Sequence, residues 1–441
     1  MEKLGKKPRT IKKTLVRDSA LGRNQNLKSP RASVFVGTRP NSRDEFDGGQ
    51  VSGDSKRKGV VFVGMSGGVD SSVTAWLLKN LGYDVTGVFM RCFNVDGCSD
   101  GDAEDARRVA GEIGIPFYEW DFIEEYKQRV VAYMIEGYKA GVTPNPDIEC
   151  NREIKFGFFL EKALKMGADY VATGHYVKNQ KSKIKNQNDN SKFKIVYKLF
   201  QAKDKNKDQS YFLWTLEQEQ LKHCLFPIGD YVKPEVREIA RKAGLSTAAK
   251  KDSQGICFLG RVNLDEFLMD YLPAKRGLVL DVSGKKLGEH NGAHFYTIGQ
   301  RQGVGNLKHQ KGVKLHKPLY VVSKDVKENT VTVAEEGDEN LYVKEVELTG
   351  VNFINRDFYS LIRTNKRMEV WARVRYRQPL ARASITYQAA GIKMKFNEPQ
   401  KFVAPGQSAV FYSKKGDPSA TLRTSPLMDS GLEMIGGGVI L

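Results

Sequence analysis

Cysteine is scarce in this chain, which has five cysteines among 441 residues. The five follow no regular spacing and form no CxxC pair, which argues against a disulfide framework, a zinc ribbon and most iron–sulfur sites. No metal site is therefore expected from the protein alone. No signal-peptide pattern precedes the cysteines, so we expect a reducing, cytoplasmic location. A transit peptide for organellar import is the minor alternative, because the first forty residues are basic and poor in acids.

The sequence also lacks long apolar runs and has too few acidic residues to balance its basic ones. Hydrophobic residues make up 40% and charged residues 28%, which is typical of a soluble globular protein with no membrane segment. The length predicts two or three domains. The formal net charge of +18 favours a polyanionic partner, with a solvated basic surface as the alternative. Roughly half of that excess precedes residue 58, so the folded part is only moderately basic.

The chain changes character near residue 58. Residues 1–57 are basic and polar without an apolar period, which predicts a disordered extension. From Val60 onward, apolar runs alternate with amphipathic segments, the order expected for a parallel sheet with helices on both faces. The expected strands are 60–63, 85–90, 117–122 and 170–173. The expected helices are one that follows SGGVD and stops at Gly82, and those at 103–113, 123–140 and 148–166. Helical spacing returns over 215–243, whereas Lys178–Lys198 is polar and is interpreted as an enlarged, solvated loop.

Beyond about residue 275, short strands with Gly and Asn turns predict a β-rich region of one or two domains. One strand, RMEVWARVRYRQ, alternates an apolar face that includes Val370 with a face that carries Arg373, Arg375 and Trp371. Such a basic, aromatic face suits RNA, where guanidinium groups meet phosphates and planar groups stack on bases. An exposed edge strand protected by charge would give the same pattern, and we weigh the two equally.

The segment GMSGGVDSS lies where a buried strand turns into a helix. Glycines there allow close backbone approach, and the amides at the helix start point toward an anion. No lysine precedes the serine pair, so it is not a GxxxxGKS loop. The segment resembles the signature of the PP-loop ATP pyrophosphatases, which implies ATP binding with Mg²⁺ and cleavage between the α and β phosphates. The resemblance assigns ATP binding to Gly64, Met65, Ser66, Gly67, Gly68, Val69, Asp70, Ser71, Ser72, Met90 and Gly174.

Two cysteines bear on the choice of reaction. Cys150 lies in TPNPDIECNREIKF, where a helix is expected to begin near Asp147, and a thiol in a first helical turn beside Arg152 should have a lowered pKa. Cys257 lies in the glycine-flanked KKDSQGICFLG, a loop that could swing as a sulfur carrier must. The other three, Cys92, Cys98 and Cys224, are interpreted as small buried hydrophobes.

Several motifs in order resemble the tRNA-specific 2-thiouridylases of the bacterial and organellar type. They are GMSGGVDSS, GVFM, TPNPDIECN, ATGHY, KDQSYFL, KDSQGICF, GEHNGAHFYTIGQR and APGQSAVFY, and they span about Gly59 to Val439. The resemblance implies an enzyme in which ATP adenylates the C2 oxygen of the wobble uridine. Sulfur from a persulfide then gives 2-thiouridine, AMP and pyrophosphate. A cysteine desulfurase or sulfur-relay protein would donate the sulfur to a monomeric enzyme.

The resemblance also assigns residues and domains. Cys257 matches the persulfide position and Cys150 the nucleophile that completes transfer, by releasing sulfide or by forming a transient disulfide with Cys257. Asn145, Pro146 and Asp147 match the target-base segment, with Asp147 an acid or base or, equally, a helix N-cap. The implied tRNA contacts are His175, Lys207, Asp208, Gln209, Arg375, Tyr376 and Gln407. The implied domains are a PP-loop catalytic domain at 58–257 with a helical, tRNA-contacting part at about 205–257, a small central domain at 258–340 and a C-terminal β-barrel at 341–441.

The sequence departs from the family pattern in its basic extension, in the polar segment near residue 185 and in GVGNLKHQKGVKLHKPLY after GQR. Three other functions remain open. A small-molecule adenylating ligase would use ATP but needs neither Cys150 nor Cys257, and an inactive RNA-binding module would bind tRNA without releasing AMP. A tRNA thiolase that makes 4-thiouridine or thiolates cytidine is the nearest rival, against which the β-rich C-terminal half and the absence of CxxC argue.

Overall fold

The computed structural model describes residues 58–93, 99–186, 189–252, 263–301, 317–365, 367–389, 391–413 and 431–441. The expectations for the N-terminal extension, for Cys98 and for Cys257 fall outside these residues. Within them, no helix combines the length and apolar character needed to cross a membrane.

The N-terminal half is built on a five-stranded parallel sheet in the order β3-β2-β1-β4-β7. Its strands are β1 (Val60–Gly64), β2 (Asp84–Arg91), β3 (Phe117–Asp121), β4 (Tyr170–Thr173) and β7 (Cys224–Leu225). The first four confirm the expected strands. The fifth was missed because it is two residues long and lies inside a segment with helical spacing.

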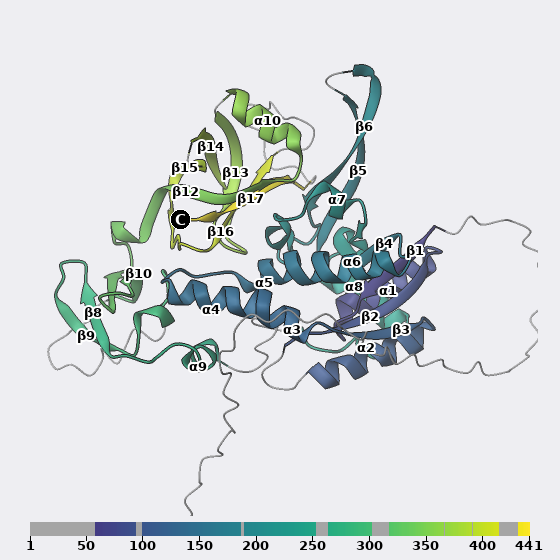
Figure 1. The fold of residues 1–441 in the computed structure, drawn as a ribbon, viewed down its shortest axis with the longest axis horizontal. Helices are drawn as coiled ribbons and strands as arrows, with labels where there is room; N and C mark the ends of the chain where they lie inside the picture. Colours follow the sequence, from purple (N-terminus) through teal and green to yellow (C-terminus); the bar gives the residue numbers. More distant parts are fainter. Residues whose placement is uncertain are drawn as a thin grey trace, which may run out of the picture. The chain divides into compact units, whose positions relative to one another are not determined.

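Alternating residues of β1 build two cores, one on each face of this sheet. Val61 and Val63 pack with α1 (Val69–Asn80), α2 (Ser99–Ile113) and α8 (Lys233–Lys242). Phe62 faces the other way, into a core shared with α6 (Phe159–Lys165) and the segments before it. Figure 1 shows the sheet between these helices. The prediction of a parallel sheet with helices on both faces is confirmed.

The two helices expected at 123–140 and 148–166 are each continuous but contain wide, π-type turns. The first consists of α3 (Ile123–Tyr126), η1 (Lys127–Val131) and α4 (Ala132–Lys139), and the second of α5 (Pro146–Glu149), η2 (Cys150–Phe158) and α6. The second begins two residues earlier than expected because Asn145 caps it. Its Oδ1 accepts a hydrogen bond from the Ile148 amide at 3.3 Å, and Pro146 occupies the first helical position. The interpretation of Asp147 as the N-cap was therefore wrong.

Short elements fill the rest of this half. They are η3 (Ser210–Leu213), α7 (Gln218–Leu221) and η4 (Pro227–Asp230), so the helical spacing over 215–243 is interrupted twice before α8. After α9 (Leu264–Met269) comes a separate four-stranded sheet in the order β10-β11-β8-β9. Its elements are β8 (Gly277–Asp281), β9 (Lys286–His290), η5 (Ala293–Phe295), β10 (Leu319–Asp325) and β11 (Thr330–Glu335).

The C-terminal part is a six-stranded antiparallel barrel, as expected. The strand order β12-β15-β14-β13-β16-β17 closes because β12 also pairs with β17. The elements are η7 (Glu339–Leu341), β12 (Tyr342–Phe353), α10 (Arg356–Asn365), β13 (Arg367–Arg373), β14 (Ala381–Gln388), β15 (Gly391–Lys401), β16 (Ser408–Ser413) and β17 (Glu433–Ile440). Closure leaves the barrel strands without free edges.

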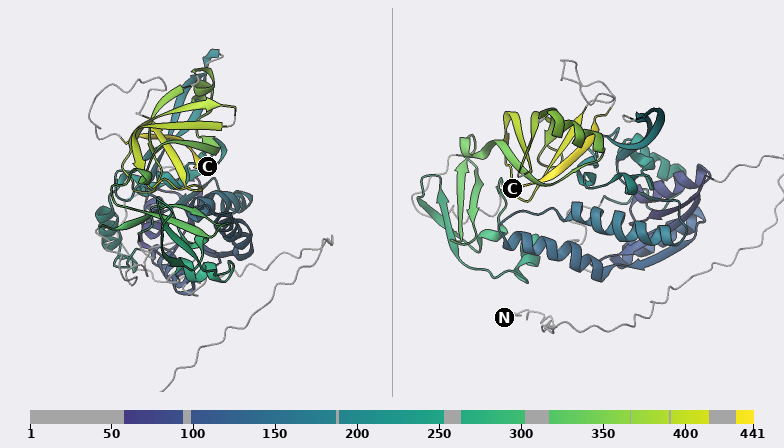
Figure 2. Two further views of the ribbon diagram at one scale, coloured as in Figure 1. Left: turned by 90° about the vertical axis from the view of Figure 1, so that its left-hand side faces the viewer. Right: turned by 45° about the horizontal axis from the view of Figure 1, so that its top comes forward.

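The polar segment interpreted as an enlarged loop is instead a β-hairpin, which corrects that prediction. It consists of β5 (Val177–Asn186) and β6 (Asp189–Gln201), and β6 pairs with β17 of the barrel through Phe200 and Leu199. Pairing with a strand more than 230 residues away supplies the backbone partners that the local sequence did not reveal. Figure 2 shows this hairpin beside the barrel.

The arginine-bearing strand also differs from both interpretations offered for it. β13 pairs with β14 on one side and β16 on the other, so it is not an edge strand. Its apolar face is confirmed, with Val370 and Ala372 in the barrel core. On the other face Arg373 is buried in an ion pair with Asp208, which lies in the N-terminal half. That face therefore joins the barrel to the rest of the molecule at this point.

Candidate functional site

The segment GMSGGVDSS at 64–72, the predicted phosphate loop, lies at the point where the strand order of the parallel sheet reverses. From β1 the chain forms β2 and β3 on one side and then returns to form β4 on the other side of β1. Ligands of open α/β sheets bind at this reversal, beyond the carboxyl ends of the strands. Gly64 ends β1, Met90 lies near the end of β2, and Gly174 follows β4. The sheet thus brings three separate parts of the predicted ATP site to one edge.

Close backbone packing at the loop requires glycine at two positions. Gly67 has a φ of +71°, and a Cβ there would lie 2.3 Å from the Asp102 carbonyl oxygen. A Cβ on Gly174 would lie 2.7 Å from the Ser71 amide nitrogen. The start of α1 is capped by Gly68 without a side-chain hydrogen bond. Its first amides are therefore left for an anion, as at other helix N-termini.

Serine hydroxyls hold the loop in shape. Ser71 Oγ accepts a hydrogen bond from the Ser66 amide at 3.1 Å, and Ser72 Oγ donates to the Gly68 carbonyl at 2.9 Å. Thr247 in turn donates to Ser72 Oγ at 3.0 Å. Met65 and Val69 are buried core residues, so only their backbone groups could face a ligand.

A network of charged side chains extends from the loop through Asp70. Its carboxylate accepts hydrogen bonds from Lys233 Nζ at 2.8 and 2.9 Å and from the Tyr176 hydroxyl at 2.8 Å. Lys233 also pairs with Asp252 at 2.8 Å, which Lys207 and Arg237 contact at 2.6 and 2.8 Å. Asp204 adds a third carboxylate, whose Oδ2 accepts a hydrogen bond from the Lys233 amide at 2.9 Å, so three cations and three carboxylates form this cluster beside the loop.

Charge and burial shift two pKa values in this network. Burial opposes ionisation of Asp252, but hydrogen bonds from Lys207 and Lys233 outweigh it and lower its pKa to about 2. Burial and the neighbouring Asp70 raise the pKa of Tyr176 far above its ordinary value, so its hydroxyl stays protonated and donates. Sequence reasoning missed Lys233. A signal was available, since a lysine in the first turn of a helix opposes the helix dipole.

Cys150 lies inside the second long helix and is only 5% exposed. Its amide already donates to carbonyls of the preceding turn, so the thiol is further from the helix start than expected and the dipole acts on it less. Asn151 donates to the Phe212 carbonyl at 3.1 Å. One turn later, Phe156 packs against His175, with ring centroids 5.9 Å apart. The Cys150 helix is thus packed against the segment that follows Gly174.

The remaining cysteines differ in their surroundings. Cys224 is buried and donates to the Gln220 carbonyl at 3.1 Å, and burial raises the pKa of its thiol, as expected of a small core residue. Cys92 is half-buried beside the core.

Comparison with known proteins identifies the relatives of the chain. Three family profiles match in order, described as a tRNA methyl transferase HUP domain at 59–261, a tRNA methyl transferase PRC-barrel domain at 265–335 and an aminomethyltransferase beta-barrel domain at 343–418. The tRNA-specific 2-thiouridylase MnmA of Streptococcus thermophilus is 45% identical over 387 residues, which cover 86% of this chain and 94% of the relative. The chain belongs to the tRNA-specific 2-thiouridylase family.

Further relatives agree. The proteins of the same name in Streptococcus sanguinis and Lactococcus lactis are each 44% identical, over 86% and 82% of this chain and 94% of the relative. Among solved structures, an NMN synthetase from Francisella tularensis is 15% identical with a TM-score of 0.30, covering 49% of this chain and 74% of that chain. That likeness is too low to carry an argument.

In this member of the thiouridylase family, the barrel holds the segment that precedes the predicted target-base residues. Gln407 Nε2 donates to the Thr143 carbonyl at 2.8 Å, and the Thr143 amide donates to Pro405 O at 2.8 Å. A Cβ on Gly406 would lie 2.9 Å from the backbone of Thr143. Gln407, expected to touch tRNA, here positions the chain two residues before Asn145.

The other residues assigned to tRNA mostly make contacts within the protein. Lys207 forms an ion pair with Asp252, and Asp208 forms one with Arg373. Gln209 Oε1 accepts a hydrogen bond from the Tyr176 amide at 2.9 Å. His175 is buried and exchanges a hydrogen bond of 2.7 Å with Thr173, and burial followed by the Lys155 charge lowers its pKa well below the ordinary value. It is therefore neutral.

Arg375 and Tyr376 lie where the barrel meets the N-terminal half. Arg375 donates to the Ile298 carbonyl, and burial lowers the pKa of its guanidinium. Tyr376 packs against Phe212, with ring centroids 4.5 Å apart and the rings tilted by 51°. Because Asn151 donates to the Phe212 carbonyl, the Cys150 helix, KDQSYFL and the barrel turn after β13 form one continuous set of contacts.

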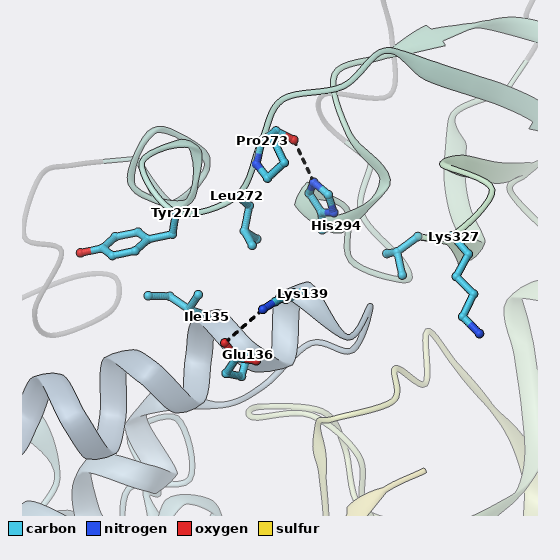
Figure 3. Close-up of a pocket in the computed structure, with 9 residues that line it drawn as sticks. Ile135, Glu136, Lys139, Tyr271, Leu272, Pro273, His294 and Lys327 are labelled. Atoms are coloured by element: carbon cyan, nitrogen blue, oxygen red, sulfur yellow. Dashed lines mark hydrogen bonds and ion pairs between the residues drawn. The ribbon is translucent and has the colours of Figure 1, made fainter. Parts of the chain in front are cut away.

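A cleft of about 480 Å³ lies elsewhere, between α4 and the part of the chain that contains α9 and the four-stranded sheet β10-β11-β8-β9. Figure 3 shows residues that line it, which come from α4, from the segment after α9, from η5 and from the β10–β11 turn. Among the predicted site residues that the structure describes, none lines this cleft.

Proposed function

We propose that this enzyme is a tRNA-uridine 2-sulfurtransferase. It uses ATP to convert the wobble uridine of tRNA to 2-thiouridine, with release of AMP and pyrophosphate. The observation that carries the proposal is the 45% identity to a tRNA-specific 2-thiouridylase over 86% of the chain. The phosphate loop at the strand reversal supports it independently, because this is where an open α/β sheet binds its ligand.

The residues present fit a nucleotide. The uncapped start of α1 offers amides to phosphate, and Gly67 and Gly174 allow the close backbone packing that shapes the loop around it. Lys233 and Lys207 lie beside the loop, paired with Asp70 and Asp252, and would be available to phosphate once those ion pairs are exchanged. Asp70 is the carboxylate that would hold Mg²⁺ with the phosphates, and its contact with Lys233 would then have to be exchanged.

Binding ATP supplies the adenylyl group that turns the C2 oxygen of uracil into a good leaving group. The protein orients the base for this step. Asn145, Pro146 and Asp147 form the first helical turn beside the barrel loop and would hold the uracil, with Asp147 as acid or base. An anticodon base reaches such a pocket at modest cost because it is not in a duplex.

Sulfur transfer would then use two cysteines. A cysteine desulfurase or sulfur-relay protein loads Cys257 with a persulfide, whose terminal sulfur bonds to C2 while the bond from C2 to the adenylated oxygen breaks and AMP leaves. Attack of Cys150 on the sulfur of Cys257 splits the persulfide and leaves a disulfide, which a cellular thiol reduces. In the other order, Cys150 splits the persulfide first and free sulfide attacks C2.

Either route requires the Cys150 thiol to become accessible. At 5% exposure the sulfur is enclosed, so binding of tRNA has to loosen the segment around it. The barrel loop that holds Thr143 is suited to this task, because it contacts the chain just before the helix that carries Cys150. We propose that a monomer carries out the reaction.

Substitution of the two cysteines separates activation from sulfur transfer. Cys150→Ser and Cys257→Ser should each lower 2-thiouridine formation at least a thousandfold, while tRNA-dependent release of pyrophosphate continues. Mass spectrometry of digested tRNA measures the first quantity and a coupled pyrophosphate assay the second. Cys92→Ser is the matched control and should retain both.

The outcomes distinguish the competing functions. Adenylation that continues in both Ser variants, with no 2-thiouridine formed even by the wild type, would favour a small-molecule adenylating ligase. Binding of tRNA by the wild type without any pyrophosphate release would favour an inactive RNA-binding module, and 4-thiouridine or a thiolated cytidine among the products would favour the other thiolases.

A further inference from the structure

The β5–β6 hairpin is firmly held at its base and projects beyond it. Asn179 donates to the Leu221 and Cys224 carbonyls at 2.8 and 2.9 Å. Gln218 exchanges two hydrogen bonds with the backbone of Tyr197, at 2.9 and 2.8 Å. Beyond the residues held by these hydrogen bonds, Figures 1 and 2 show a two-stranded ribbon that extends away from α7. The six residues from Lys181 to the end of β5 correspond to a reach of about 20 Å.

One face of this ribbon combines lysines with exposed apolar side chains. Lys181 pairs with Tyr197 and Lys183 with Ile195, so these residues share a face, and alternation places Phe193 on it as well. Phe193 is 64% exposed and Ile195 is 46% exposed. We call the set Lys181, Lys183, Phe193 and Ile195 the ribbon face.

Positive charge on the hairpin is balanced at its base but not further out. Residues 178–198 contain seven lysines and one acidic residue. At the base, Lys178 pairs with Asp230 at 2.5 Å and Lys198 with Glu433 at 3.0 Å. Lys181 and Lys183 are exposed, and neither forms an ion pair within the described residues. Lys181 and Lys183 thus offer charge that no described carboxylate neutralises.

Protection of a sheet edge explains only part of this pattern. β5 is the edge strand of its sheet, and lysines on an edge discourage pairing with another chain. Edge protection gives no reason for Phe193 and Ile195 to be exposed on the inner strand. A ribbon that alternates ammonium groups with apolar or aromatic side chains has the chemistry that binds RNA, through phosphates and base faces.

We propose that the ribbon face is a second tRNA-binding surface, separate from the nucleotide site. This inference rests on the proposed function, since tRNA is the polyanion that such an enzyme binds. Lys181 and Lys183 contact phosphates of the tRNA backbone, and Phe193 packs against a base or ribose. An acidic protein partner is the competing occupant, and the experiment separates the two.

The test compares two double variants that remove equal charge. K181Q/K183Q neutralises the ribbon face, whereas K285Q/K344Q neutralises two exposed lysines outside the hairpin. Binding of an unmodified tRNA transcript to the full-length protein is measured by fluorescence anisotropy at several salt concentrations. K181Q/K183Q should bind the tRNA about tenfold more weakly than the wild type does. In a plot of the logarithm of the association constant against the logarithm of the salt concentration, the magnitude of its slope should be smaller by about 2. Its kcat for 2-thiouridine formation should stay unchanged while KM rises.

Further outcomes decide the matter. F193S should raise KM about tenfold without changing the salt slope, because it removes a stacking contact and no charge. Equal affinity and equal slope in K181Q/K183Q and the control overturn the proposal, as does self-association of the ribbon variant in light scattering with tRNA binding intact. Loss of sulfur-donor binding at unchanged tRNA affinity assigns the face to a protein partner instead. If the wild type thiolates no tRNA, the proposed function itself fails, whatever the ribbon does.

Discussion

The ion pair between Asp208 and Arg373 allows a sharp test of whether a residue assigned to tRNA acts on tRNA directly. The two side chains are 1% and 5% exposed, and their charged atoms are 2.7 Å apart. Asp208 also accepts hydrogen bonds from the Ala202 and Ser210 amides, the Ser210 hydroxyl and Gln201, at 3.0 to 3.3 Å. A carboxylate with five donors inside the protein cannot contact tRNA without first losing some of them.

The substitution Asp208→Asn keeps the shape of the side chain but removes its charge. Arg373 then stays buried without a counterion, and breaking such a pair costs about 3 to 5 kcal/mol. The new amide side chain also places an NH₂ group opposite at least one group that donated to the carboxylate, and the loss of that hydrogen bond lowers stability further. The expected decrease in the free energy of unfolding is therefore about 4 kcal/mol, a large fraction of the total for most proteins.

Urea unfolding followed by tryptophan fluorescence measures this decrease. One of the four tryptophans, Trp214, donates to Ser408 Oγ at 3.1 Å, so part of the change in emission reports on the joint between the two halves. Glu369→Gln is the control, because Glu369 forms a more exposed ion pair with Arg367 on the same barrel strand and should cost about 1 kcal/mol or less. The double variant D208N/R373M should recover about 2 kcal/mol relative to D208N, because no unpaired guanidinium remains.

An unchanged unfolding midpoint in D208N would refute this reasoning. If that variant also bound tRNA tenfold more weakly, Asp208 would be a direct tRNA contact, as the family resemblance implies. A reduced midpoint with normal affinity for tRNA below the unfolding transition would assign it a positioning role.

Two further predictions concern packing and pH. Gly174→Ala should weaken ATP binding at least tenfold in calorimetry, because the added Cβ would lie 2.7 Å from the Ser71 amide, whereas Gly111→Ala, with open space around it, should bind ATP normally. Burial lowers the pKa of Lys324 to about 8, from 10.5, so the folded state binds fewer protons than the unfolded state between these values and stability should rise with pH there. Lys324→Met should accordingly stabilise the protein by about 2 kcal/mol at pH 7, after allowance for the lost hydrogen bond to the Tyr296 carbonyl. In melting experiments at several pH values, the variant should not show the rise in stability between about pH 8 and 10.5. A variant less stable than the wild type at pH 7 would contradict the argument.

The parts of the fold that the sequence predicted are those specified by local pattern. Buried apolar runs gave four strands of the parallel sheet, and glycines after β1 marked the phosphate loop. The β5–β6 hairpin was missed because its strands read as polar, and their pairing depends on β17, far away in the sequence. Cys257 lies outside the described residues, so its role stays a prediction.

Arg373 and Lys233 illustrate why charged residues were harder to assign. An arginine on an alternating strand looks the same whether its partner is an RNA phosphate or a carboxylate from another part of the chain. Only the fold shows that Arg373 meets Asp208. Lys233 likewise lies 163 residues from Asp70 in sequence and meets it only because α8 packs beside α1.

The KDQSYFL segment connects the separate parts of the site. Its first three residues contact different partners. Lys207 pairs with Asp252, which comes five residues before Cys257 in the sequence, and Asp208 pairs with Arg373 of the barrel. Gln209 accepts a hydrogen bond from the Tyr176 amide. Tyr176 in turn donates to Asp70 of the phosphate loop. A displacement of the barrel by bound tRNA would therefore be transmitted through packed, hydrogen-bonded side chains to Asp70 of the phosphate loop and to Asp252. That continuity gives a physical reason to expect nucleotide activation and sulfur transfer to respond to the same tRNA.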